Sequence, residues 1–201
     1  MTNTLDRTAA FRLAGGFLAS VLVCAALMAG GCGGEFVSPL GHTTTSQEDV
    51  ARTAFEALRA NDPEAMVSLY PTAEDMRWFF ERMRGVVGED EYQEGMQGIE
   101  KRGGFEAVLA EVHAECRRDF RRASEESLQA LDWRSARYLG LDAERTEEKE
   151  DDGVLTADIY FKVEADGKQW LFKLDDCAET NRGWVTGDGL RFKGEYSPAE
   201  R

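Results

Sequence analysis

Apolar residues recur with the period of an α-helix through three consecutive segments that begin after residue 45. A side chain that can accept hydrogen bonds from the free amides of a first helical turn opens each segment. These signals are Ser46 three residues before Asp49, Asp62 followed by Pro63, and Thr72 three residues before Asp75. The pattern predicts three helices, over 46–61, 62–70 and 72–83.

Glycine is dense between residues 85 and 104, and glycine weakens regular structure. We therefore expect a long loop there, with one short helical piece over Tyr92–Ile99. Beyond it, the apolar residues from Phe105 to Phe120 form one stripe of a long helix, and several arginines surround that stripe. A stripe of this length predicts that the helix packs across a flat partner.

The last third of the chain changes to the period of a β-strand. Apolar and polar residues alternate over 155–164, so one face of this strand is apolar and the other is solvated. Asp166-Gly167 then predicts a hairpin turn, because both residues tolerate positive φ. Further strands are expected over 136–141, 168–176 and 184–192. Helices that pack on an antiparallel sheet, formed by the C-terminal third, define an α+β fold.

The first residues are typical of bacterial export, because Arg7 and Arg12 precede the uncharged apolar stretch 13–29. The small residues 29–31 before Cys32 resemble the lipobox of bacterial lipoproteins, in which the cysteine thiol is acylated before cleavage. A lipobox usually has leucine three residues before the cysteine, whereas this chain has alanine there. We expect cleavage before Cys32. The alternative is an uncleaved signal anchor, although its glycines make a weak spanning helix.

These features divide the chain into four parts. They are a signal peptide over 1–31, a lipidated cysteine with a flexible tether over 32–45, an α+β domain over 46–194 and a disordered tail over 195–201. Acyl chains on Cys32, palmitate among them, are expected to hold the protein in the membrane. By resemblance to lipoprotein sorting, Gly33 after the cysteine implies the outer membrane of the cell envelope.

The net charge of the chain argues against two classes of binding partner. The chain has 38 Asp and Glu residues against 24 Lys and Arg residues, a formal net charge of -14. This balance argues against nucleic acid, whose phosphates require clustered cations, and against docking of the domain on anionic lipid. The acidic run 147–152 lacks the alternating oxygen ligands of a calcium loop, so we interpret it as a charged hairpin tip.

Three stretches together resemble a known superfamily. They are AFEALRANDPEAMVSLYP at 54–71, ADIYFKVEADGKQWLFKLDD at 157–176 and NRGWVTGD at 181–188. Their helix pair, acidic turn and terminal hairpins are similar to the nuclear-transport-factor-two-like, cystatin-like cone superfamily, which includes SnoaL-like domains. The resemblance implies a strongly bent sheet wrapped around helices, often with a conical pocket. It implies no single activity, because the fold hosts enzymes and non-catalytic modules alike.

The resemblance also indicates which side chains would line such a pocket. They are Tyr70, Trp78, Phe79, Trp170, Phe172 and Asp176. In cone-fold enzymes that move protons, a pocket carboxylate or tyrosine pair does the chemistry. Asp176 fits that role if it follows Trp170 and Phe172 inward, with Tyr70 or Tyr92 as a partner. A solvated or turn-capping aspartate is the alternative, and we assign no catalytic residue.

Two cysteines remain after Cys24 is discarded with the signal and Cys32 is acylated. Cys116 and Cys177 are a disulfide candidate in an exported protein. Strict alternation puts Cys177 on the outer face of its strand, so the bond requires a β-bulge near Asp175 and Asp176, and both outcomes stay open. His113 lies three residues before Cys116, but no further ligands accompany the pair. We therefore expect no metal and no cofactor.

The function expected from the sequence is that of a non-catalytic, lipid-anchored envelope protein whose domain binds a small apolar ligand or an envelope partner. One alternative is an isomerase or hydratase of the cone fold that uses a pocket carboxylate. Another is a structural interaction module without a pocket. An enclosed cavity with buried polar pairs would favour the enzyme, an apolar cavity would favour ligand binding, and a filled interior would favour the interaction module.

Overall fold

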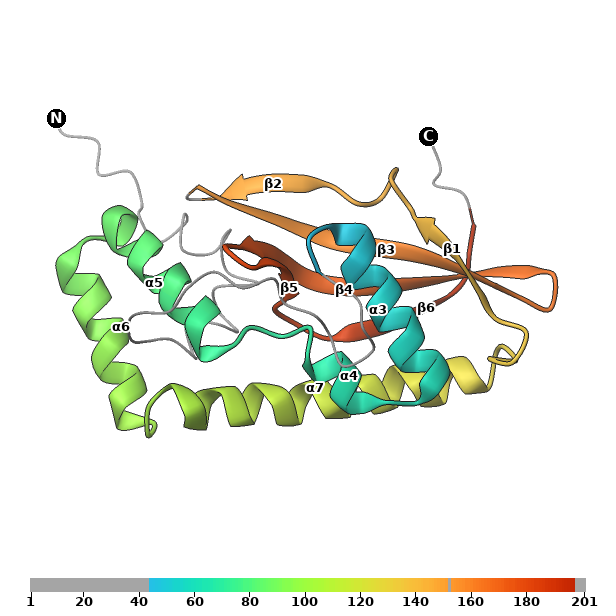
Figure 1. The fold of residues 1–201 in the computed structure, drawn as a ribbon, viewed down its shortest axis with the longest axis horizontal. Helices are drawn as coiled ribbons and strands as arrows, with labels where there is room; N and C mark the ends of the chain where they lie inside the picture. The colour runs from blue at the N-terminus through green and yellow to red at the C-terminus, as the bar shows by residue number, and fades with distance from the viewer. Residues whose placement is uncertain (1–43, 152, 198–201) are drawn as a thin grey trace, which may run out of the picture.

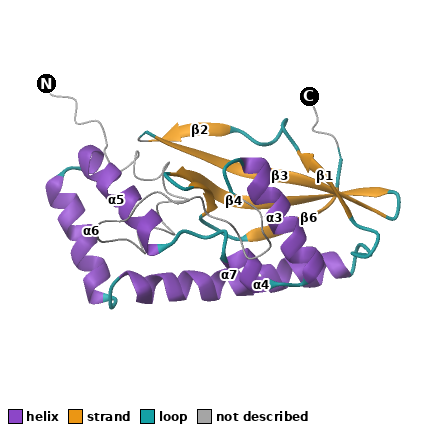
Figure 2. Cartoon of the chain, in the orientation of Figure 1, coloured by secondary structure: helices purple, strands orange, loops and turns teal. Residues whose placement is uncertain are grey.

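Helices occupy the first part of the chain and strands the last, as expected for an α+β fold (Figures 1 and 2). The structure is a computed structural model that describes residues 44–151 and 153–197. The predicted signal peptide, Cys24, Cys32 and most of the predicted tether lie outside the described residues.

The predicted helix starts are confirmed. The helices are α3 (Gln47–Ala60), α4 (Pro63–Val67), α5 (Ala73–Val87), α6 (Glu89–Lys101) and α7 (Phe105–Leu128). Both capping boxes form, one at Ser46 before α3 and one at Thr72 before α5. The carboxylate of Asp62 accepts from the amides of the first turn of α4, where Pro63 stands at the first helical position.

The long loop predicted over 85–104 is wrong. Helix α5 continues to Val87, and α6 follows at once after Gly88, which has a φ of 90°. The apolar side chains of Tyr92, Met96 and Ile99 bury one face of α6 against its neighbours. Gly95 faces the ring of Phe80 on α5, at a distance where a methyl group would make an ordinary van der Waals contact. Packing of that apolar face outweighs the low helix propensity of glycine.

The sheet has six antiparallel strands. They are β1 (Arg137–Leu141), β2 (Glu148–Asp151), β3 (Val154–Ala165), β4 (Lys168–Thr180), β5 (Gly183–Thr186) and β6 (Leu190–Glu195). The long β3–β4 hairpin forms its centre and turns at Asp166 and Gly167, both at positive φ. Strands β1 and β2 pair with β3 on one side, and β5 and β6 pair with β4 on the other.

Two details of the sheet differ from the predicted meander. The acidic run that we interpreted as a hairpin tip contributes strand β2, which extends the edge beside β3. Strand β6 pairs with β4 and not with β5, the strand before it in sequence. The result is a curled, half-barrel sheet whose two long strands run through the middle (Figure 1).

Helix α7 contributes residues to two hydrophobic clusters. The part of the helix from Cys116 onward, including Phe120, joins α3, α4 and the sheet in the main core. Its N-terminal half, including Val108 and Leu109, packs with α5 and α6 in a second cluster. Val112 contacts both clusters. Figure 1 shows α7 along the length of the molecule, with α5 and α6 folded back at one end and α3 in front of the sheet.

Residues at both ends of the described chain are bonded to the sheet. Thr44, within the predicted tether, is buried, and its carbonyl accepts from the amide of Trp184 at 2.6 Å. Tyr196, within the predicted tail, donates its amide to the carbonyl of Gln169 at 2.8 Å. Within the described residues, none of the helices combines the length and apolar character needed to cross a membrane.

Candidate functional site

The concave face of the curled sheet is filled by aromatic side chains. The rings of Phe161 on β3 and Phe172 on β4 stack with their centroids 5.3 Å apart, and both residues are fully buried. Trp133 lies 5.7 Å from Phe172, and Phe192 on β6 lies 5.1 Å from it, ring centre to ring centre. Phe55 on α3 packs against Trp133 from the helical side.

The structure does not gather the six predicted pocket residues around one cavity. Tyr70, Trp170 and Phe172 belong to the main core. Phe79, with the partly buried Trp78 beside it, forms a separate small cluster with residues of β3, β4 and β5. Asp176 lies apart from both clusters, at an irregularity in β4.

That irregularity is a β-bulge. Ala157 of β3 faces Cys177 and Ile159 faces Leu174, so Asp175 and Asp176 together stand opposite Asp158. Asp176 has a φ of 50°, which is uncommon for a residue other than glycine. The extra residue shifts the alternation of β4, and Cys177 becomes fully buried in the main core. The bulge that an inward Cys177 requires is therefore confirmed, and Cys177, not Asp176, joins the core.

Charged side chains surround the bulge. We call this set the bulge cluster, and its members are Asp158, Lys173, Asp175, Asp176, Asp188 and Arg191. Lys173 pairs with Asp158 at 2.7 Å and also with Asp175. Arg191 pairs with Asp175 and, at 3.4 Å, with Asp188. Asp158 belongs to the solvated face of β3, so the cluster lies away from the aromatic interior.

Burial raises the pKa of Asp176 to about 6, and the neighbouring carboxylates of Asp158, Asp188 and Asp175 raise it in the same direction. The backbone amide of Asp176 donates to Asp158 at 3.2 Å. Burial lowers the pKa of Lys173, but its hydrogen bonds to the two aspartates outweigh that effect and raise it overall. The cluster is therefore tightly paired except at Asp176.

The two cysteines of the domain are free thiols, so the candidate disulfide is not formed in this structure. Cys116 hydrogen-bonds the hydroxyl of Tyr70, and burial raises the pKa of this thiol to about 12. Burial also raises the pKa of Cys177, whose Sγ lies 3.8 Å from the carbonyl oxygen of Leu174. Protonated, buried thiols are poor nucleophiles, so neither cysteine suits covalent catalysis.

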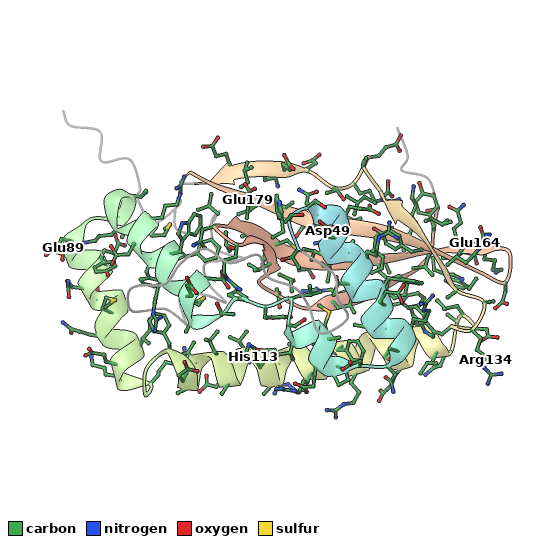
Figure 3. The ribbon with its side chains drawn as sticks, viewed as in Figure 1. Asp49, Glu89, His113, Arg134, Glu164 and Glu179 are labelled. Carbon is green, nitrogen blue, oxygen red and sulfur yellow. The ribbon has the colours of Figure 1, made fainter. Side chains whose placement is uncertain are left out.

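His113 is half-buried on α7 (Figure 3). Burial lowers its pKa, and the charge of Arg117 acts in the same direction. Across residues 44–151 and 153–197, no group of three or more histidine, cysteine, aspartate or glutamate side chains is placed to hold a metal. His113 and Cys116 therefore lack the additional described ligands that a zinc site requires.

A shallow depression lies where the end of α7 meets the β3–β4 hairpin. It is lined by residues 128–134 and by Asp166. The carboxylate of Asp166 accepts from the amide of Asp132 at 3.3 Å and from the hydroxyl of Ser135 at 3.2 Å. The hairpin tip thus fastens the loop after α7, which is a structural role. Leu128 at the rim is 61% exposed.

A buried ion pair joins α5 to the β4–β5 turn. Asp75 is fully buried, and its carboxylate accepts from Nε of Arg182 at 2.8 Å and from a second guanidinium nitrogen. The same guanidinium donates to the hydroxyl of Thr72 at 3.2 Å. Sequence reasoning identified Asp75 as a capping residue but missed Arg182, because the two lie 107 positions apart.

No family model, curated protein or solved structure matches this chain. The structure itself shows an α+β fold with a curled antiparallel sheet.

Proposed function

We propose that this protein is a lipid-anchored envelope protein whose α+β domain is a non-enzymatic interaction module. The observation that carries this proposal is the filled concave face, in which Phe161 and Phe172 are fully buried and stacked. Pockets for small molecules are hollows of about 300–1,000 Å³. Close-packed rings at this position favour binding through the outer surface over binding of an apolar ligand inside.

The anchor is the second part of the proposal. Acyl chains on Cys32 would supply membrane affinity of about 0.8 kcal/mol for each buried methylene, so the acidic domain need not touch lipid. The Gly- and Thr-rich segment up to Thr44 would span about 20 Å as a flexible coil. Since Thr44 is bonded to β5, that edge of the domain would be the one closest to the tether.

Replacing Cys32 with serine is expected to abolish acylation, because serine has no thiol to acylate, and to leave the signal peptide attached, because acylation precedes cleavage. The measurement is the intact mass of the protein extracted from membranes. Cys24→Ser is the matched control, since Cys24 lies in the segment expected to be removed, and it should give the same acylated and cleaved mass as the wild-type protein. An unacylated mass that includes residues 1–31 in the wild-type protein would reject the lipoprotein assignment and favour an uncleaved anchor.

The filled interior is tested by native mass spectrometry of the full chain, extracted from membranes in mild detergent. We expect the mass of the polypeptide with its acyl chains and no further small molecule. A complex with another protein in the same spectrum would identify the partner. A small molecule retained in native buffer and lost on denaturation would reject the module in favour of a ligand-binding cone.

One observation favours a catalytic alternative. The pKa of Asp176, about 6, is in the range that suits a general acid or base near neutral pH. Its neighbours, however, are the carboxylates and cations of the bulge cluster on the solvated side of the sheet. A proton-transfer site would need a second polar group that faces a substrate in an enclosed space. The interaction module therefore remains our proposal.

A further inference from the structure

The turn between β5 and β6 is seated directly on the β4 bulge. Three backbone hydrogen bonds hold it there. Gly187 donates to the carbonyl of Asp176 at 2.9 Å, Asp188 donates to that of Asp175 at 3.2 Å, and Asp175 donates to that of Gly189 at 3.3 Å. Residues 187–189 are thus bonded directly to the bulge, so a change in the conformation of the bulge would displace this turn.

Helix α7 and the segment after α4 hold the same turn from the other side. A methyl group on Gly189 would come within 2.5 Å of Oδ2 of Asp119 on α7, so a larger residue there would have to displace this side chain. The hydroxyl of Tyr70 donates to the carbonyl of Asp188 at 2.7 Å. The turn is therefore clamped between α7 and the bulge. We call this place the turn junction.

Charged groups from the neighbouring strands and the turn act on the carboxylate of Asp176. They are Asp158 on β3, Lys173 and Asp175 on β4, and Asp188 in the turn. Arg191 on β6 pairs with Asp175 and Asp188, and these last elements in turn meet α7, where Asp188 and Arg191 act on the carboxylate of Asp119. Carboxylates outnumber the cations in this set. Asp119 has its own cation, because Arg122 lies 3.4 Å from it on the solvent side of α7.

Both cations of the bulge cluster are already engaged. Lys173 bridges Asp158 and Asp175, and Arg191 bridges Asp175 and Asp188. Within the described residues, no ion pair or hydrogen bond forms to the carboxylate of Asp176. The strained backbone at φ 50° holds this half-buried carboxylate among three others. Like charges in this arrangement repel one another when Asp176 is ionised.

We infer that the turn junction is proton-linked: a proton bound by Asp176 removes this repulsion and tightens the turn between α7 and the bulge. The junction therefore opens more readily as the pH rises from mildly acidic to neutral. This regulation goes beyond the proposed interaction module and does not depend on it. It makes the surface formed by the turn and the adjoining part of α7 sensitive to the acidity of its surroundings.

The sign of the effect follows from the pKa of Asp176. It is about 6 in the folded protein, above the ordinary value of about 3.9. Between these values the folded state binds more protons than the open state. Stability from this group is fully present below the ordinary pKa and is lost as the pH rises through about 6.

The test is hydrogen exchange of the full chain, read on peptides that cover residues 174–190 at about pH 5 and about pH 7.5 and corrected for the intrinsic pH dependence of exchange. We expect the opening constant of the turn junction to be about three- to tenfold larger at the higher pH. Asp176→Asn should be protected to a similar extent at both pH values, because asparagine tolerates positive φ and carries no charge.

Glu179→Gln is the matched control, since Glu179 is a carboxylate on the same strand outside the bulge cluster (Figure 3). It should retain the pH dependence of the wild-type protein. Asp176→Gly provides a second variant that removes the carboxylate and also relieves the backbone strain. Equal corrected exchange of the wild-type junction at both pH values would overturn the inference. A pH dependence that persists unchanged in both Asp176 variants would overturn it as well.

Discussion

Replacing Arg182 with methionine is expected to lower the free energy of unfolding by about 3–5 kcal/mol. Asp75 is fully buried, and two guanidinium nitrogens of Arg182 are bonded to its carboxylate. Methionine conserves much of the side-chain volume but leaves the carboxylate buried without its charge partner. Since a domain of this kind is stable by only about 5–15 kcal/mol, the variant would lose a large share of its stability.

The measurement is urea denaturation of the two proteins, with the unfolding midpoint and slope compared. Arg118→Met is the matched control, because Arg118 is 59% exposed and its partner Glu115 lies 3.5 Å away. We expect that change to stay within about 0.5 kcal/mol. A double variant that combines Arg182→Met with Asp75→Asn should recover part of the loss. If Arg182→Met were as mild as the control, α5 would not depend on this ion pair.

Gly183→Ala is expected to lower the free energy of unfolding by about 2–4 kcal/mol. Gly183 has a φ of 120°, where a residue with a side chain is strained. A methyl group there would also come within 2.4 Å of the carbonyl oxygen of Thr44. That oxygen accepts the amide of Trp184, so the substitution displaces the chain from the edge of β5 and breaks a hydrogen bond.

Gly140→Ala separates the two causes in the same denaturation experiment. Gly140 has a φ of 117°, almost that of Gly183, but a methyl group there would meet nothing within 4 Å. Its substitution should therefore show the backbone strain alone, about 1–3 kcal/mol. Equal losses in the two variants would mean that the contact with Thr44 adds no stability.

Local signals in the sequence predicted the parts of the fold that local interactions decide. Ser46 and Thr72 cap their helices with carboxylates three residues away, and Asp166 turns the central hairpin together with the glycine beside it. The glycines between residues 85 and 104 misled the prediction, because the apolar face of Tyr92, Met96 and Ile99 has partners that the local pattern does not reveal.

The remaining differences come from contacts between distant parts of the chain. Strand β6 pairs with β4, and Arg182 bonds to Asp75, although the partners in each contact are separated in the sequence. Local patterns do not reveal such contacts. The sequence predicted the bulge only conditionally. Strict alternation along the strand places Cys177 on the outer face, so an inward Cys177 requires a bulge. Whether the concave face holds a pocket depends on how rings such as Phe172 and Trp133 pack, and residue spacing does not determine that packing.

Helix α7 has a further consequence for how the domain denatures. It has 24 residues and is therefore about 36 Å long, and Val112, about one third of the way along it, touches both hydrophobic clusters. Unfolding of either half of this helix would remove packing surface from the cluster on that half. It would also shorten the helix on which the other cluster packs. The two interiors therefore share one cooperative transition, and heat or denaturant should dissolve them together rather than in sequence.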